Sequence, residues 1–542
     1  MPEPKQPRGG AALSAMAAAG IFVSRIAGLV RQRVFAHYLG SSPAAAAFAA
    51  ALRIPNFLQN LFGEGALSAS FIPVYAALIG RGEREQADRV AGAVFGILAL
   101  ALAVLCALGL LASPLLVEAI APGFDGELRA LTVTLVRILF PGIALLVLSA
   151  WCLGILNSHE RVFLPYAAPV LWNGAIIGAL LLFGPGSGQA ELAVQVAWGA
   201  VIGSALQLLV QLPAVLALLG RFRPSLSPAP AREVLASFSV VVVGRGVVQL
   251  SAYLDTAFAS LVSARALAVL SYAQTIYLLP VSLFATAAVA AELPALSRAA
   301  DASDHAALRD RLSRGLSRMA FFVVPSAAAL LLLGDVVAGA LLEGGRFGAG
   351  DTRYAWYVLM GSAVGLSAQT QGRLYANAFY ALRAPRTPLR FAVVRLVLTA
   401  ILAWLSVARL PLWLGVPREL AAAFITATTG VAAWIEYALL RRALAARLGG
   451  DAALPAGRSA RLWLAAGLAA LAALGLKALL ASRFGARVSA EWGAALLPMP
   501  RLHPVLTAAI VLPAFGGLYL ALAALLGVPQ IGDLLRRGLR RR

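Results

Sequence analysis

The sequence predicts an all-α polytopic membrane protein with about fourteen transmembrane helices. Hydrophobic residues fill 61% of the 542 positions and charged residues only 13%, whereas a soluble domain is about a quarter charged. The mean hydropathy is +0.83. Apolar runs of about 20 residues recur from end to end, and each is long enough to cross a bilayer as a helix. Open sheets are excluded because lipid cannot satisfy the polar groups of their edges.

The apolar runs define fourteen spans, the second of which contains a break near Gly63–Gly65. In chain order they cover 12–37, 50–80, 90–112, 130–156, 164–183, 194–220, 234–260, 266–290, 316–342, 354–381, 389–408, 419–440, 461–481 and 504–526. An even number of spans places both termini on the same side of the membrane.

The basic residues predict which side that is. The chain carries 45 Lys and Arg against 24 Asp and Glu, a formal net charge of +21. With a cytoplasmic N-terminus, the inside loops and the two tails hold 27 of the basic residues and the outside loops hold 9. This bias follows the positive-inside rule, so both termini are expected in the cytoplasm. The basic excess then reflects topology and contact with anionic membrane lipids rather than binding of nucleic acid.

The N-terminus and the cysteines agree with this class. The first apolar stretch is too long and too rich in arginine for an ordinary cleaved signal, so we interpret it as the first span of the mature protein. Cys106 and Cys152 both fall within predicted spans. Neither therefore suggests an extracellular disulfide framework.

Four pairs of landmarks indicate an internal repeat. Proline and phenylalanine positions in the first half recur in the second at offsets of 221 to 225: Pro55 with Pro280, Pro73 with Pro294, Phe124 with Phe347, and Pro165 with Pro388. The alternative is that loops of any helical membrane protein carry Pro and Gly. A true repeat makes two lobes of six helices, in the same orientation because six is even.

The repeat predicts the domain organisation. Residues 1–220 form an N-terminal lobe and residues 221–445 a C-terminal lobe, related by a pseudo-two-fold axis along the membrane normal. A cytoplasmic linker at 446–460 leads to the last two spans and a basic tail at 461–542. Transporters of this kind place the substrate between the lobes and work by alternating access.

No motif for catalysis, metal binding or nucleotide binding is present. The four histidines are widely separated, and the chain has neither HExxH, nor GxxxxGK[ST], nor paired cysteines. We therefore expect no catalytic residue, no metal and no cofactor. Transport is either passive or driven by an ion gradient or the membrane potential.

The first two spans hold the best candidate for a binding site. Arg25, Arg31 and Arg53 lie in long apolar stretches, although a charge at the bilayer centre costs about 2.5–3.5 kcal/mol on insertion scales. Arginine binds phosphate bidentately and stays charged in a low dielectric. Several arginines around one water-filled cavity are therefore suited to holding a diphosphate.

Three neighbouring residues complete this candidate site. Asn56 supplies amide hydrogen bonds next to Pro55, which bends the helix and frees a backbone carbonyl. Glu64 lies between two glycines, and we expect it to pair with an arginine when substrate is absent.

Helix geometry complicates the assignment of the first span. On an unbroken helix Arg31 lies about 120° around the axis from Arg25, so both face one cavity only if the helix bends, with Gly28 as the hinge. The alternative is that Arg25, Arg31 and Arg33 extend to the membrane surfaces.

The C-terminal lobe offers further charges within spans. Arg373 is the preferred partner of the N-terminal arginines. Arg245 and Asp255 are as suited to an internal salt bridge as to ligand binding, and Arg395 to extension toward the membrane surface. Lys477 is expected to have a local structural role.

Two long runs in the first two spans are SRIAGLVRQRVFAHYLG at 24–40 and RIPNFLQNLFGEGALSASFIPVY at 53–75. Both resemble the start of the MurJ/MviN family of bacterial lipid II flippases. The similarity continues with PYAAPVLWN at 165–173 and FYALRAPRTPLR at 379–390. It covers most of residues 11–445 in order.

The resemblance implies fold, substrate and site. The family belongs to the multidrug/oligosaccharidyl-lipid/polysaccharide exporter superfamily and has two six-helix lobes with a C-terminal helix pair that forms a lipid-tail groove. It implies flipping of an undecaprenyl-diphosphate-linked peptidoglycan precursor to the periplasmic leaflet of the inner membrane. Arg25 and Arg31 match the two first-span arginines that the family needs, Glu64 its second-span glutamate, and Arg373 a basic residue of its tenth span.

Several family charges are neutral in this chain. Gln32 replaces an acid, Ala46 an aspartate, Gln59 a basic residue, and Gln274 with Thr275 an Asp-Arg pair. These departures leave two alternatives open: a flippase for another lipid-linked oligosaccharide, or a scaffold for peptidoglycan-synthesis enzymes that has lost transport.

Two other classes fit the sequence less well. A drug/cation antiporter needs an acidic cavity, and this one is basic. A membrane glycosyltransferase or polyprenyl-diphosphate phosphatase needs clustered acids or an Arg/His set. The outside loops offer only scattered acids: Asp125, Glu127, Glu343, Asp351 and Glu491.

Overall fold

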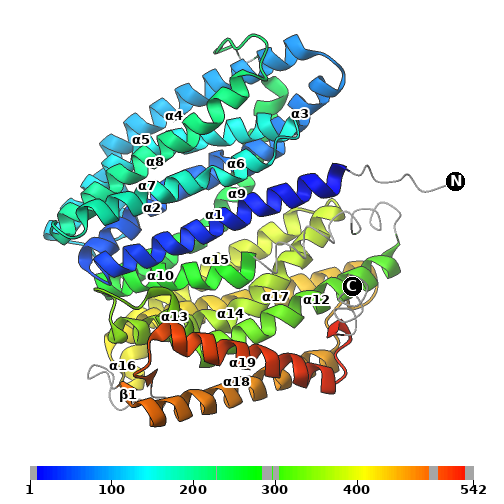
Figure 1. Ribbon diagram of the computed structural model, residues 1–542. Helices are drawn as coiled ribbons and strands as arrows, with labels where there is room; N and C mark the ends of the chain where they lie inside the picture. The colour runs from blue at the N-terminus through cyan, green and yellow to red at the C-terminus, as the bar shows by residue number, and fades with distance from the viewer. Residues whose placement is uncertain (1–8, 228, 283–295, 297–303, 488–498, 532–542) are drawn as a thin grey trace. The chain divides into compact units, whose positions relative to one another are not determined.

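A computed structural model describes residues 9–227, 229–282, 296, 304–487 and 499–531 of the chain (Figure 1). The basic C-terminal tail, the end of the predicted span 266–290 and the repeat landmark Pro294 lie outside these ranges. The side chains of Pro55, Glu64 and Arg245 are likewise outside the description.

The first half of the chain forms helices of very different lengths. They are α1 (Gly9–Leu39), α2 (Pro43–Phe62), α3 (Glu64–Gly80), α4 (Arg84–Ile120), α5 (Gly126–Ser158), α6 (Phe163–Ala167), α7 (Pro169–Phe183) and α8 (Gln189–Leu216).

The second half continues with helices and one pair of very short strands. The helices are α9 (Arg232–Val262), α10 (Ala264–Pro280), α12 (His305–Leu332), α13 (Gly334–Leu342), α14 (Ala349–Ala381), α15 (Arg386–Ala408), α16 (Leu410–Leu414), the 3₁₀ turn η2 (Arg418–Leu420), α17 (Ala421–Leu448), α18 (Ala456–Phe484) and α19 (Pro504–Leu525). Strands β1 (Ala486–Arg487) and β2 (Met499–Pro500) pair antiparallel between α18 and α19.

The all-α polytopic prediction is confirmed. Each predicted span corresponds to a helix or to two consecutive helices. In the described part of the chain, nine helical segments are long and apolar enough to cross a membrane. The predicted break in the second span is real, since α2 ends at Phe62 and α3 begins at Glu64. Only glycine fits between them, because a Cβ on Gly63 would lie 2.3 Å from the carbonyl oxygen of Gln59.

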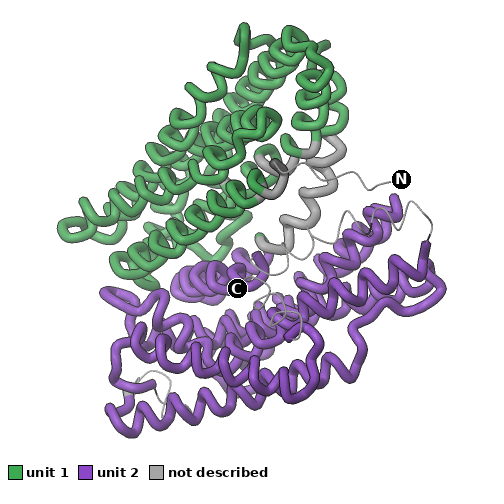
Figure 2. Tube along the Cα trace, turned by 45° about the vertical axis from the view of Figure 1, so that its right-hand side comes forward, with its two compact units in different colours: residues 1–253 green, residues 254–542 purple. Residues whose placement is uncertain are grey.

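The chain divides into two compact units (Figure 2). Unit 1 runs from Met1 to Tyr253 and unit 2 from Leu254 to Arg542, so the division falls within α9. The lobe boundary at 220 and 221 was derived from the repeat and stays a prediction. Unit 2 also contains α18 and α19.

Both units are built around one buried helix. In unit 1, α5 packs against α2, α3, α4 and α8. In unit 2, α14 packs in the same way against α10, α12, α13 and α17. A second layer follows in each unit, where α7 packs on α8 and α15 packs on α17. The two halves therefore share one packing scheme, as a repeat requires.

The two central helices match residue by residue. Helices α5 and α14 each have 33 residues, and both of their ends are offset by 223 (349 − 126 and 381 − 158). Just beyond each C-terminus a residue other than glycine takes a left-handed conformation, Glu160 with φ 60° and Arg383 with φ 54°. These are the two positive-φ residues other than glycine in the described chain, and they are also 223 apart. Since such a conformation costs about 1–2 kcal/mol, the repeated turn is strong support for the repeat.

Helices α18 and α19 pack side by side on unit 2 (Figure 1). Their small and aromatic residues form one core with α12 and α13, which includes Phe321, Ala466, Phe515 and Tyr519. The Tyr519 hydroxyl donates a hydrogen bond to the Phe321 carbonyl at 2.6 Å. The C-terminal pair is therefore an integral part of unit 2.

Candidate functional site

Helix α1 places Arg31 on a neighbouring aromatic ring. The guanidinium carbon of Arg31 lies 4.8 Å from the centroid of the Trp172 ring on α7. At this distance a cation is attracted by the negative face of an indole. Within the described residues, no hydrogen bond or ion pair joins the Arg31 guanidinium to another protein group. No described residue therefore competes with a ligand for its N–H donors.

Small residues let α1 approach its neighbours closely. A Cβ on Gly20 would lie 2.9 Å from the Cβ of Tyr166 on α6, and one on Gly28 would lie 3.9 Å from Oδ1 of Asn173 on α7. At the other end, a Cβ on Gly184 would clash with the ring of Tyr38 at 2.4 Å. Helix α1 thus follows α6 and α7 along its length, on the side that carries Arg31.

The other first-span candidates lie elsewhere on α1. The helix is continuous from Gly9 to Leu39 and runs through Gly28 without interruption. Arg25 is exposed, Gln32 is buried, and Arg33 is partly buried. Arg25 and Arg31 therefore occupy different faces of one helix, and a hinge at Gly28 that would bring them together stays a prediction.

The second-span candidates lie on α2 and at the start of α3. Arg53 is partly buried, and its backbone carbonyl accepts a 2.7 Å hydrogen bond from the Tyr253 hydroxyl. Asn56, one turn later, is exposed. Helix α2 continues through Pro55, and Glu64 is the first residue of α3. The break at Gly63 thus sets Glu64 at a helix N-terminus, where a carboxylate is favoured.

Unit 2 holds a second set of charges inside its helices. Arg373 on α14 is exposed. Arg395 forms an ion pair of 3.1 Å with Glu436 on α17. The prediction that Arg395 extends to the membrane surface is therefore wrong, because a carboxylate on the adjacent helix neutralises it.

Asp255 also has a partner that the sequence did not indicate. Thr429 on α17 donates a hydrogen bond of 2.9 Å from Oγ1 to Asp255 Oδ1. The Arg245 side chain lies outside the described part, and its pairing with Asp255 stays a prediction. Threonine is common in the helices of this chain, so nothing in the sequence indicates that Thr429 is the partner of Asp255. The hydrogen bond is visible only in the structure.

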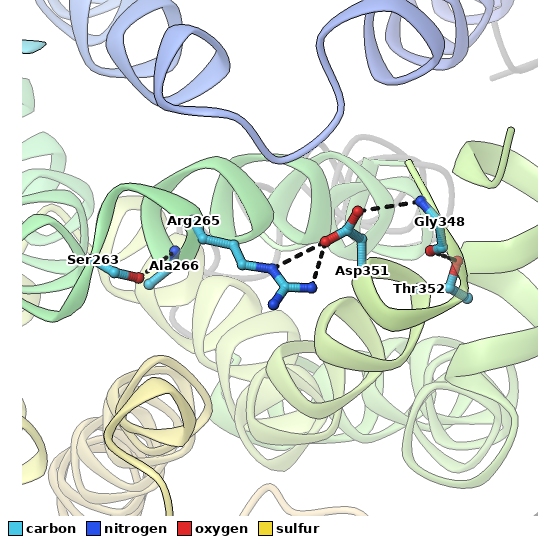
Figure 3. Close-up of polar contacts among 6 residues, drawn as sticks. All are labelled: Ser263, Arg265, Ala266, Gly348, Asp351 and Thr352. Atoms are coloured by element: carbon cyan, nitrogen blue, oxygen red, sulfur yellow. Dashed lines mark hydrogen bonds and ion pairs between the residues drawn. The ribbon is translucent and has the colours of Figure 1, made fainter. Parts of the chain in front are cut away.

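A third network joins the starts of α10 and α14 (Figure 3). Arg265 donates from Nε and Nη2 to Oδ1 of Asp351, at 3.0 and 2.7 Å. Oδ2 of the same carboxylate accepts from the backbone N–H of Gly348 at 3.2 Å, and Ser263 caps α10 by accepting from Ala266 at 3.0 Å. Asp351 is therefore a structural acid at a helix start. Both oxygens of the Asp351 carboxylate accept hydrogen bonds within this network, so its role here is structural.

Lys477 and Asp335 anchor the C-terminal helix pair, as expected from a local structural role. Both side chains are almost fully buried, with exposed fractions of 1% and 4%, and Lys477 Nζ donates to Asp335 Oδ2. Lys477 Nζ also lies 5.5 Å from the centroid of the Trp356 ring. The pair links α18 to α13.

His159, in the turn after α5, has the environment of a structural residue. Burial and the nearby charges of Arg84 and Arg161 lower the pKa of its imidazole. The ring is therefore mainly neutral at pH 7 and hydrogen-bonds through Nε2 to the Tyr75 hydroxyl at 3.1 Å. In the described residues no group of three or more His, Cys, Asp or Glu is placed to bind a metal.

Comparison with known proteins decides the family. A family model described as lipid II flippase MurJ matches residues 35–498. The chain belongs to the MurJ family. A lipid II flippase MurJ of Burkholderia cenocepacia is 33% identical over 392 residues, which cover 70% of this chain and 74% of that protein. A probable lipid II flippase MurJ of Rhizobium meliloti is 32% identical over 425 residues, 77% of each chain.

Solved structures show the same fold for this MurJ-family chain. A lipid II flippase MurJ in an inward closed conformation matches with a TM-score of 0.74 and 22% identity, covering 96% of this chain and 100% of that chain. An inward-facing MATE family multidrug transporter of the MOP superfamily matches with a TM-score of 0.65 and 19% identity, covering 79% and 95%. The family assignment made from the sequence runs is confirmed, as is the superfamily fold.

Proposed function

We propose that the protein is a lipid II flippase of the bacterial inner membrane. It moves the undecaprenyl-diphosphate-linked peptidoglycan precursor from the cytoplasmic to the periplasmic leaflet by alternating access. Membership of the MurJ family and the names of its relatives support this assignment. On this proposal the protein is a transporter and not an enzyme.

The environment of Arg31 is the observation that carries the proposal. An arginine inside an apolar helix is costly, and among the described residues no carboxylate is paired with Arg31 to offset that cost. The guanidinium instead rests on a ring and keeps its donors open, which suits a ligand with several anionic oxygens. Exposed Arg25, Asn56 and Arg373, with Arg53 and Glu64, extend the candidate set for the diphosphate and the sugar head group.

The driving force and orientation are part of the same proposal. Both termini lie in the cytoplasm, in line with the excess of basic residues in the inside loops. Moving one elementary charge through 100 mV is worth about 2.3 kcal/mol, so the membrane potential can drive an anionic head group outward. An ion gradient is the alternative source. Membrane lipids and peptidoglycan-synthesis enzymes are the expected partners.

A different lipid-linked oligosaccharide is the second candidate substrate. Ala46, where the family usually has an aspartate, is fully buried. The Thr275 hydroxyl donates a hydrogen bond to the Ser271 carbonyl at 3.2 Å. Gln32 is also buried. Ala46 and Gln32 are packed into the protein and Thr275 is half-buried, so none of the three presents a charge, and this favours a head group with fewer ionic contacts.

A complementation experiment distinguishes the two substrates. The chain is expressed in a bacterium depleted of its own lipid II flippase, and exposure of lipid II at the outer leaflet is measured. We expect growth and lipid II exposure to return. Well-expressed protein that restores neither would contradict lipid II as the substrate and would favour the other glycan.

A further inference from the structure

Arg31 is held in an unusual way for an intramembrane arginine. Its neighbour in sequence, Gln32, is neutral and buried, and the Trp172 ring is the group against which the guanidinium packs. Among the described intramembrane arginines, Arg395 is held by a carboxylate at 3.1 Å, and Arg137 donates from Nε to the Ser113 hydroxyl at 2.9 Å. Arg31 is therefore fixed by different means from these two.

The backbone that carries this ring is fixed by the packing of α7 on α8. A Cβ on Gly203 of α8 would lie 2.9 Å from both the Cα and the carbonyl oxygen of Trp172. The absence of a side chain at Gly203 thus lets α8 press against the Trp172 backbone. Gly28 of α1 lies beside Asn173, the next residue on α7, where a Cβ would make an ordinary contact of 3.9 Å with Oδ1. Trp172 is held from one side by α8 and meets Arg31 on α1.

A ring and a carboxylate leave a guanidinium in different states. A carboxylate occupies N–H donors at the edge of the fork and cancels the positive charge. An aromatic ring contacts the flat face, so all five donors in the guanidinium plane stay open and the charge remains. The ring therefore restricts the rotamers of Arg31 without competing with an anionic ligand.

We propose that Trp172 is a positioning residue for substrate binding, which holds Arg31 with its donors directed to the diphosphate. This inference rests on the proposed function and adds to it a residue that touches the arginine and not the substrate. In this chain the aromatic ring orients the cation, next to a neutral glutamine at position 32.

Binding of undecaprenyl diphosphate to the purified full-length protein tests the proposal. Affinity is measured by native mass spectrometry for the wild type, Trp172→Leu, Arg31→Ala and the double variant. We expect Trp172→Leu to weaken binding about fivefold and to have no further effect when Arg31 is already alanine. Trp172→Phe keeps a ring and should restore most of the affinity. It also tests the idea if the leucine variant folds poorly.

Trp198 provides a matched control, since it lies exposed on α8, and Trp198→Leu should bind as the wild type does. Equal losses from Trp172→Leu with and without Arg31 would overturn the inference, because the ring would then act independently of the arginine. Unchanged affinity in Trp172→Leu would overturn it as well. If the wild type binds no undecaprenyl diphosphate, the proposed function itself fails, which is a different result.

Discussion

Among single residues, five of the charges within the helices fall into two kinds according to their partners. Lys477 and Arg395 each contact a carboxylate on a neighbouring helix. Arg31 contacts an aromatic ring, and Arg25 and Arg373 are exposed. Charges of the first kind are neutralised and link helices, so their loss should affect stability. Charges of the second kind retain their donors, so their loss should affect binding.

The Lys477–Asp335 pair offers a stability test of the first kind. Lys477→Met leaves a buried carboxylate without its partner, and breaking such a pair typically costs about 3–5 kcal/mol. We expect a clear fall in the thermal unfolding temperature in detergent. Adding Asp335→Asn should recover much of it, because the uncompensated charge is then gone.

The exposed pair Arg129–Glu118 is the control for this measurement. Its side chains are 42% and 62% exposed, and surface pairs contribute about 0–1 kcal/mol. The Arg129→Met protein should therefore unfold at a temperature close to that of the wild type. A Lys477→Met protein as stable as Arg129→Met would refute the anchoring role of the buried pair.

Among the secondary-structure elements, the central helix of each unit depends on close contact with another helix. On α14, a Cβ at Gly365 would lie 2.5 Å from the Cα of Gly430 on α17. Gly142, at the equivalent position of α5 (365 − 142 = 223), faces Ser204 of α8, and a Cβ there would lie 3.3 Å from its hydroxyl oxygen. The repeat thus preserves a small residue where the central helix α5 crosses α8 and where α14 crosses α17.

Gly365→Ala tests this crossing. The added methyl meets backbone and cannot be relieved by a side-chain rotation, so α14 and α17 must separate; overpacking typically costs about 1–3 kcal/mol. We expect a lower unfolding temperature. Gly467→Ala on α18 is the control, because no atom of the described residues outside its own helical turn lies within 4 Å of its Cβ position, and alanine there should be neutral or stabilising. If the Gly365→Ala protein unfolds at the wild-type temperature, the crossing of α14 and α17 accommodates a larger side chain than the structure indicates, and the prediction is wrong.

The same elements show how far the sequence could predict the structure. The sequence predicts the spans because the length of an apolar run sets the length of a membrane helix. It predicts the repeat offset of about 223 residues because tight turns favour particular residues, which recur at that spacing. The Arg395–Glu436 and Asp255–Thr429 contacts could not be predicted, since they depend on the rotation of each helix about its axis and on which helices are neighbours. The Arg31–Trp172 contact joins positions 31 and 172, and an apolar tryptophan in a span gives no sign of its role.

At the scale of the whole molecule, family membership, helical composition and charge distribution agree on a multi-pass protein of the bacterial inner membrane. The central claim is that intramembrane arginines bind the diphosphate of a lipid-linked precursor. This claim concerns the arginines without a carboxylate partner in the described part of the chain, Arg31, Arg25 and Arg373. It requires that removing one of them stops transport while the protein remains folded.

The most direct test measures lipid II exposure at the outer leaflet in flippase-depleted cells that express Arg31→Ala or Arg25→Ala at the level of the wild type. Hydrogen bonds to charged groups contribute about 1.5–3 kcal/mol, so exposure should fall by roughly 10- to 100-fold. Arg129→Ala, which removes an exposed arginine, should retain full activity. Normal lipid II exposure in both Arg31→Ala and Arg25→Ala cells would contradict the account.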